Sequence, residues 1–131
     1  MSGHGKVKKT LDACRRNARR WFMKEPTITR AIYDGRGELN DSGEGAVYAY
    51  FRADGRAMYV GQTGGRVKTR AHFKTSKHKD ALWWSKWRSM RFIQIPNQVD
   101  RFALESLLIL ELKPIYNRTP KAKAFRDATL L

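Results

Sequence analysis

The sequence predicts an α/β (α+β) domain with a three-stranded antiparallel sheet flanked by helices. Two β-rich runs, 46–52 and 57–61, flank an Asp-Gly pair, which is a strong hairpin signal because the turn needs positive φ. A third β-rich run, 91–95, stands between segments of helical character. Hydrophobic residues are 41% and aromatic residues 11% of the 131 residues, enough to form the core of one domain.

A basic N-terminal extension, residues 1–44, precedes the hairpin. Its stretch 6–24 carries apolar side chains at helical intervals and predicts a basic helix. Residues 27–33 then alternate in the manner of a short strand, and residues 34–45 are rich in Gly, Asp, Asn and Ser, which is typical of a loop.

The hairpin register follows from centring the turn on Asp54-Gly55. Tyr50 then faces Tyr59 across the two strands. In the same register, Tyr48 faces Gly61. The three tyrosines therefore share one face of the sheet. The opposite face is predicted to be a core face and carries Val47, Ala49, Phe51, Met58 and Val60.

Two helices are predicted between the hairpin and the third strand, over 66–74 and 79–87. Trp83, Trp84 and Trp87 in the second of them form an aromatic ridge. Such a ridge belongs either to the core or to a surface on which nucleic-acid bases stack.

The last predicted helix begins at Asn97, whose spacing to Asp100 is that of a capping box, and ends before Pro114. Within it, Glu105 is the only ionisable group of the apolar stretch 102–110. A buried carboxylate is costly unless something pairs with it. The partner is either an arginine, in a structural ion pair, or a divalent cation.

The charge balance indicates the class of partner. The chain has 27 Lys+Arg against 12 Asp+Glu, a formal net charge of +15, which attracts polyanions and favours a nucleic acid. The absence of an apolar run of about 18 residues, and of a signal-peptide segment, argues against a membrane or secreted protein. With a single cysteine, Cys14, this predicts a cytoplasmic protein.

The order of these motifs resembles the GIY-YIG nuclease family over roughly residues 45–118. The first motif stands here as Ala-Val-Tyr at 46–48, and the second as Tyr-Val-Gly-Gln-Thr at 59–63. A helix with an arginine, a helix with one glutamate and a Pro-Ile-Tyr-Asn segment follow. The spacing from Glu105 to Asn117 is similar to that in the nuclease domain of the bacterial excision-repair incision protein.

The resemblance implies a metal-dependent endonuclease that hydrolyses DNA phosphodiester bonds. Glu105 would hold one divalent cation, Mg²⁺ or Mn²⁺. A tyrosine would deprotonate the attacking water, an arginine would stabilise the charge of the transition state, and Asn117 would orient its neighbours. The implied catalytic residues are Tyr48, Tyr59, Arg70, Glu105 and Asn117, with Arg66 and His72 as alternates.

The sequence departs from the family pattern at several positions. Ala46 replaces the usual first Gly, and Gln62 stands where several relatives have Lys, so a basic phosphate contact is lost there. Many relatives carry His or Tyr four residues after the arginine, where this chain has Lys74. Either His72 or His78 fills that role, or both simply face solvent.

The predicted organisation is a basic extension (1–44), a GIY-YIG-like nuclease domain (45–118) and a basic tail (119–131). The predicted partner is double-stranded DNA, bound by a monomer or a homodimer. Two alternatives remain: a non-catalytic nucleic-acid-binding protein, as an inactivated relative or a ribosome-associated protein, and a nuclease for RNA or single strands. Nucleic-acid contacts are expected from Arg15, Arg16, Arg19, Arg20, Arg66, Lys68, Lys74, Lys77 and His78.

Overall fold

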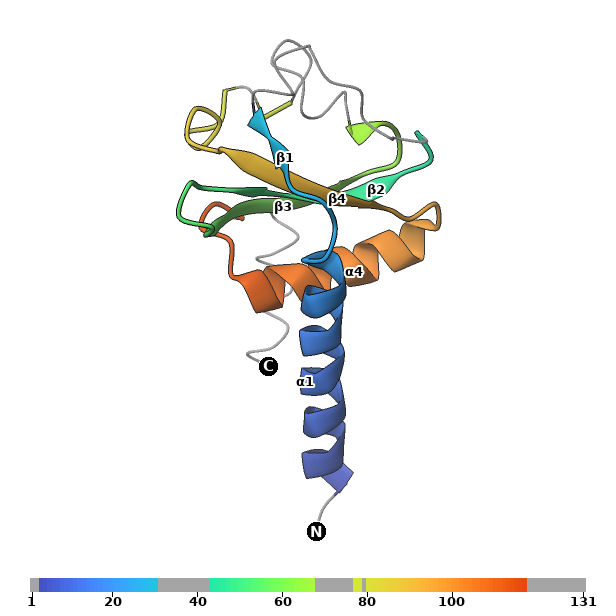
Figure 1. Ribbon diagram of the computed structural model, residues 1–131. Helices are drawn as coiled ribbons and strands as arrows, with labels where there is room; N and C mark the ends of the chain where they lie inside the picture. Colours follow the sequence, from blue (N-terminus) through green and yellow to red (C-terminus); the bar gives the residue numbers. More distant parts are fainter. Residues whose placement is uncertain (1–2, 31–42, 68–76, 79, 118–131) are drawn as a thin grey trace.

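In a computed structural model, an antiparallel sheet lies across helix α4, and helix α1 projects away from both (Figure 1). The structure describes residues 3–30, 43–67, 77–78 and 80–117. The sheet has four strands in the order β1-β4-β2-β3. The elements are α1 (Gly3–Phe22), β1 (Ile28–Thr29), β2 (Ala46–Phe51), β3 (Ala57–Thr63), β4 (Ser89–Gln94) and α4 (Gln98–Leu112).

The α+β class predicted from the sequence is confirmed, but the prediction of three strands is wrong by one. The fourth strand, β1, is only two residues long and pairs with β4 through Ile28↔Met90 and Thr29↔Ser89. β1 lies within residues 27–33, which the alternating pattern predicted as a short strand, but the pattern did not place that strand in the sheet. The pairing with β4 is a tertiary contact that the local sequence does not encode.

The hairpin has the predicted register: Tyr48 pairs with Gly61, and Tyr50 pairs with Tyr59. Gly55 supplies the positive φ of the turn, at +85°, and its N–H donates to the carbonyl of Arg52 at 2.9 Å. The Asp-Gly signal was therefore sufficient to align the two strands.

A β-bulge next to the turn corrects the prediction for Met58. The register shifts between Tyr50 and Phe51, so that Phe51 pairs with Ala57 and Met58 is the extra residue. Ala57 packs with Phe51 on the predicted core face, whereas Met58 packs with Tyr48 and Tyr50 on the other face.

Both faces of the sheet are buried. The predicted core face lies against α4 and the end of α1, and the tyrosine face is covered by the tryptophan-rich segment. Tyr48 and Tyr50 are completely buried there. The cluster on the α4 side is Phe22, Val47, Ala49, Phe51, Ala57, Val60, Leu104 and Leu108; the cluster on the tyrosine side is Ala46, Tyr48, Tyr50, Met58, Val67, Trp83, Trp84, Trp87 and Met90.

The helix predicted over 79–87 is not formed, because residues 80–86 make successive turns. Each turn closes over three residues, as in the bond from the N–H of Trp84 to the carbonyl of Ala81 at 3.0 Å. The turns bring three neighbouring indoles onto the sheet together, so the tryptophans are core residues and not an exposed stacking surface. The helix predicted over 66–74 lies mostly outside the described residues.

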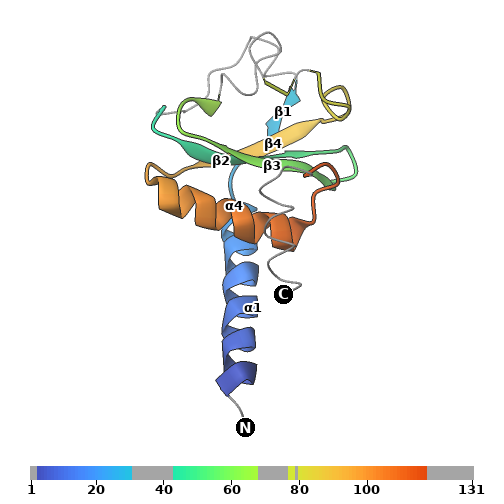
Figure 2. The same cartoon turned by 180° about the vertical axis from the view of Figure 1, so that it is seen from behind.

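Helix α4 begins and ends as its sequence predicts, whereas α1 begins three residues before the predicted stretch 6–24 and ends two residues earlier, at Phe22. The side chain of Asn97 accepts a hydrogen bond from the N–H of Asp100 at 3.0 Å and caps α4, which ends at Lys113 in the left-handed conformation. The basic helix α1 ends before Pro26 and docks through Phe22, while its first turns stand clear of the sheet (Figures 1 and 2). No helix of the described residues is long and apolar enough to cross a membrane.

Candidate functional site

A buried hydrogen bond joins the hairpin to the tryptophan-rich segment. The hydroxyl oxygen of Tyr48 lies 2.8 Å from Nε2 of His78. The His78 ring is 8% exposed, and its centroid is 4.6 Å from that of Tyr59 and 5.2 Å from that of Trp83. The prediction that His78 faces solvent is therefore wrong, because aromatic rings enclose it.

Gly61 makes the position of the Tyr48 hydroxyl possible. A Cβ at residue 61 would lie 2.7 Å from the hydroxyl oxygen of Tyr48 and 2.8 Å from Cε1 of Tyr59. No side chain fits in that space. The glycine of the second motif thus lets the two tyrosines approach each other, with ring centroids 6.4 Å apart.

Asn117 holds the outer edge of β3. Its Oδ1 accepts from the N–H of Val60 at 2.7 Å, and its Nδ2 donates to the carbonyl of Val60 at 2.8 Å. The residue before it, Tyr116, donates its N–H to the carbonyl of Met58 at 2.9 Å. The side-chain amide thereby fixes the backbone between Tyr59 and Gly61.

Glu105 lies on α4, which packs against the face of the sheet opposite to the tyrosine rings. It belongs to the stripe of α4 that faces the sheet, next to Leu104 and Leu108, and is 6% exposed. The tyrosine rings lie on the other face of the sheet, so the sheet separates them from Glu105. β3 is an edge strand of the sheet, and residues 115–117 bond to its outer edge.

The donor set at Glu105 fits one kind of metal. Within the part of the chain that the structure describes, no three His, Cys, Asp or Glu side chains gather in a group that could hold a metal ion. Mg²⁺ is commonly bound by one or two carboxylates together with water and substrate phosphate. A single buried carboxylate suits such a site, whereas a structural Zn²⁺ needs four protein ligands.

Arg101 is a site residue that the sequence reasoning missed. It precedes Glu105 by one helical turn and is 7% exposed. Its Nη1 donates to the carbonyls of Ile95 at 2.9 Å and Pro96 at 2.7 Å, and its Nε donates to Oε1 of Gln62 at 3.3 Å. The only sequence signal was the spacing of four residues from Glu105 on one helix.

Of the two arginines predicted for catalysis, the structure describes Arg66 but not Arg70. Arg66 is exposed, and its side chain lies against the loop before β2, with Cγ 3.2 Å from the Cβ position of Gly43. Arg70 lies outside the described residues, as do the other predicted residues of that segment: Lys68, His72 and Lys74.

Residues 44–118 match the family model of the UvrC-like GIY-YIG domain. This chain belongs to the GIY-YIG family. The match covers more than half of the chain and confirms the resemblance seen in the motifs. Proteins of this family are generally nucleases that act on nucleic acids, and the net charge of +15 agrees with such a partner. Neither the curated proteins nor the solved structures gave a match.

Outside the GIY-YIG domain, α1 presents a row of exposed cations. Arg16, Arg19 and Arg20 line a concavity of about 370 Å³ beside Glu111 of α4. Arg15 is half-buried and pairs with Asp12 at 2.5 Å, so its charge is partly neutralised. Lys77, the remaining predicted contact, is exposed.

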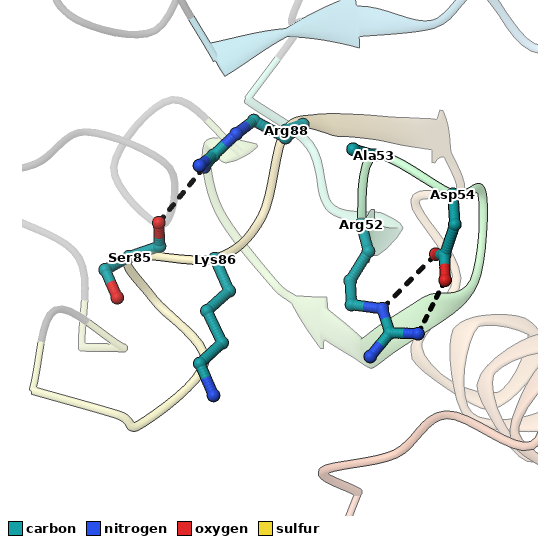
Figure 3. A pocket seen from close by; sticks show the side chains of 6 residues that line it. All are labelled: Arg52, Ala53, Asp54, Ser85, Lys86 and Arg88. Carbon is teal, nitrogen blue, oxygen red and sulfur yellow. Dashed lines mark hydrogen bonds and ion pairs between the residues drawn. The ribbon is translucent and has the colours of Figure 1, made fainter.

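A second basic concavity lies at the tip of the GIY-YIG hairpin, with a volume of about 380 Å³ (Figure 3). Arg52 there pairs with Asp54 at 2.6 Å and holds the pKa of that carboxyl at about 2. Arg88 donates to the carbonyl of Ser85 at 3.0 Å. Both guanidinium groups thus bond to the protein, and Lys86 is the third cation that lines the space (Figure 3).

Proposed function

We propose that this chain is an endonuclease that hydrolyses DNA phosphodiester bonds with one Mg²⁺ or Mn²⁺ ion. The observation that carries the proposal is the hydrogen bond of 2.8 Å between Tyr48 and His78 inside a GIY-YIG domain. This hydrogen bond joins the phenol of Tyr48, which is a poor base, to the imidazole of His78, which can accept the phenol proton. Asn117 holds the edge strand β3, and Glu105 is buried on α4, the helix that packs against this strand.

Tyr48 is the general base of the proposed reaction. A phenol has a pKa near 10, so it removes a proton from water near neutral pH only if another group accepts its own proton. As the Tyr48 hydroxyl oxygen takes the water proton, Nε2 of His78 takes the phenol proton. The resulting hydroxide attacks phosphorus, and the bond to the leaving 3′-oxygen breaks.

Tyr59 and Asn117 hold this base in position. The ring of Tyr59 packs against His78 and stacks on Trp83 with centroids 5.1 Å apart. Asn117 fixes Val60 from the outer edge, and so fixes the strand on both sides of that residue. Preorganised groups of this kind do not need to be rearranged during the reaction.

Glu105 is the ligand for the cation. When bound, the ion supplies positive charge that polarises the phosphate and neutralises the leaving oxygen. The burial of Glu105 favours such pairing, because a carboxylate loses hydration there. Arg70, with Arg66 as the alternate, supplies the second positive charge at the phosphate.

Double-stranded DNA is the proposed substrate because of α1. A helix enters the major groove of B-DNA, whereas the major groove of A-form RNA is too narrow for it. The twenty-residue helix α1 projects from the body and exposes Arg16, Arg19 and Arg20 (Figure 2). One active site cuts one strand, so a monomer nicks the duplex and a double-strand break requires a homodimer or two events.

The test is nicking of supercoiled plasmid by the wild type and Glu105→Gln, each with Mg²⁺ and with EDTA. We expect nicking only by the wild type with metal. The proposal fails if Glu105→Gln cuts as well as the wild type. It also fails if the wild type binds DNA but does not cut it, and the chain is then a nucleic-acid-binding protein.

A comparison of Arg70→Ala with Arg66→Ala identifies the catalytic arginine. The variant of the catalytic arginine should lose cleavage and keep DNA binding.

A further inference from the structure

Arg101 is a buried cation held by neutral groups. Within the described residues no carboxylate lies within ion-pair distance of it, and its acceptors are the carbonyls of Ile95 and Pro96 and the amide of Gln62. A charge that is removed from water is costly unless an opposite charge pairs with it. The surroundings of Arg101 are therefore complementary to an anion.

One nitrogen of the guanidinium remains available to such an anion. Nη2 makes no hydrogen bond to the described part of the chain, and it lies 3.6 Å from the Cβ position of Gly64. Gly64 is exposed and has no side chain to cover the approach. On the other side of the guanidinium, a Cβ at residue 45 would clash with Nη1. The guanidinium therefore fits there because residue 45 is a glycine.

The position of Arg101 connects this nitrogen to the proposed reaction. Arg101 and Glu105 lie four residues apart on the sheet-facing stripe of α4, which brings their Cβ atoms to about 5–6 Å. Its partner Gln62 directly follows Gly61. We infer that Arg101 binds a backbone phosphate of the DNA next to the phosphate that is cut; this inference rests on the proposed function.

The guanidinium suits a phosphate for two reasons. Its N–H groups match the spacing of phosphate oxygens, and its charge is retained at every physiological pH. Gln62 and the two carbonyls fix its plane before the substrate arrives. The site contributes binding and register, while the chemistry stays with Glu105 and Tyr48.

The test measures binding of a short DNA duplex by fluorescence anisotropy, in EDTA and over a salt series, for the wild type and Arg101→Met. We expect about tenfold weaker binding, and a plot of log affinity against log salt whose slope is smaller by about 0.9, the value for one lost phosphate contact. Arg91→Met is the matched control. Arg91 is half-buried, stacks on Phe51 at 5.1 Å and is separated from β3 by β2.

Two further measurements make the test decisive. Gly64→Val leaves Arg101 in place and covers Nη2, so it should reproduce the smaller salt slope even if Arg101→Met is unfolded in a thermal melt. An uncharged methylphosphonate at the contacted position should weaken the wild type and leave Arg101→Met unaffected. A wild-type salt slope in Gly64→Val, or in folded Arg101→Met, overturns the inference. Because binding is measured without metal, an inactive protein in the plasmid assay leaves this result unaffected.

Discussion

The hydroxyl oxygen of Tyr48 and Nε2 of His78 lie 2.8 Å apart, although the two residues belong to segments on opposite sides of β3 in the chain. If this pair deprotonates water, Tyr48→Phe and His78→Gln should each lower the nicking rate by about 10²–10⁴-fold, the usual contribution of a general base. The rate of plasmid nicking at fixed Mg²⁺ measures the effect.

The pH profile separates this role from a structural one. The wild-type rate should fall at acid pH, because a protonated imidazole can no longer accept the phenol proton. Glutamine does not titrate, so His78→Gln should lack this limb. Tyr50→Phe, on the same face and fully buried, is the control and should keep both rate and profile. An unchanged profile in His78→Gln would exclude the proton transfer.

Gly61→Ala should destabilise the protein through the Tyr48 hydroxyl. The new Cβ would lie 2.7 Å from that oxygen and 2.8 Å from Cε1 of Tyr59, between the buried ring of Tyr48 and the half-buried ring of Tyr59. Overpacking of this kind costs about 1–3 kcal/mol. Urea denaturation measures the free energy of unfolding, and Gly5→Ala is the control, because a Cβ there meets nothing within 4 Å. Equal stability of both variants would contradict the prediction.

Asn117→Ala should loosen the edge of β3. It orphans the N–H and the carbonyl of Val60, and each unsatisfied buried group costs about 1–3 kcal/mol. Asn117→Asp keeps the acceptor but turns a negative oxygen toward the carbonyl, so it should destabilise as well. Amide hydrogen exchange at Val60 should accelerate in Asn117→Ala. Protection equal to that of the wild type would show that the amide does not hold the strand.

Local signals account for what the sequence predicted well. The Asp-Gly pair aligned Tyr48 with Gly61, and Asn97 marked the start of α4, because turn and cap chemistry act over three or four residues. The prediction for Met58 failed because a bulge shifts the pairing by one residue beside the turn. The alternation of apolar and polar residues along a strand does not predict where an extra residue is inserted.

The site contacts that the sequence did not predict are contacts between segments that are distant in the chain. His78 meets Tyr48 only because successive turns, and not a helix, carry the tryptophans onto the sheet. Arg101 meets Gln62 across 39 residues, and its guanidinium fits only because residue 45 is a glycine. Neither contact has a periodicity, so the sequence could name His78 only as an alternative to His72, and it did not distinguish Arg101 from the many other basic residues.

Phe22→Ala should release α1 from the body. The side chain of Phe22 is fully buried among Val47, Leu104 and Leu108, and removing a buried phenyl ring costs about 3–5 kcal/mol. Its neighbour Trp21 is 51% exposed, so Trp21→Ala is the control and should stay within about 0.5 kcal/mol of the wild type. Chemical denaturation compares the two. Similar losses in both variants would mean that α1 is not anchored through Phe22.

Asp54 should make a pH-dependent contribution to stability. Two hydrogen bonds from Arg52 hold its pKa at about 2, below the ordinary 3.8. A carboxyl whose pKa is lower in the folded state stabilises the fold above its ordinary pKa, and this stabilisation is lost as the pH falls through the folded value. Asp54→Asn should therefore be less stable than the wild type at pH 7, and the difference should disappear between about pH 4 and pH 2.

The effect should be small, because the pair is exposed and screened by water. Asparagine keeps the oxygen that accepts from the N–H of Arg56, so the turn itself is preserved. Arg52→Gln should lose the same pH dependence, and the double variant should lose no more than either single one. Urea midpoints at pH 7, 4 and 2 in low salt measure the difference. A difference that stays constant over this range would show that the ion pair does not contribute.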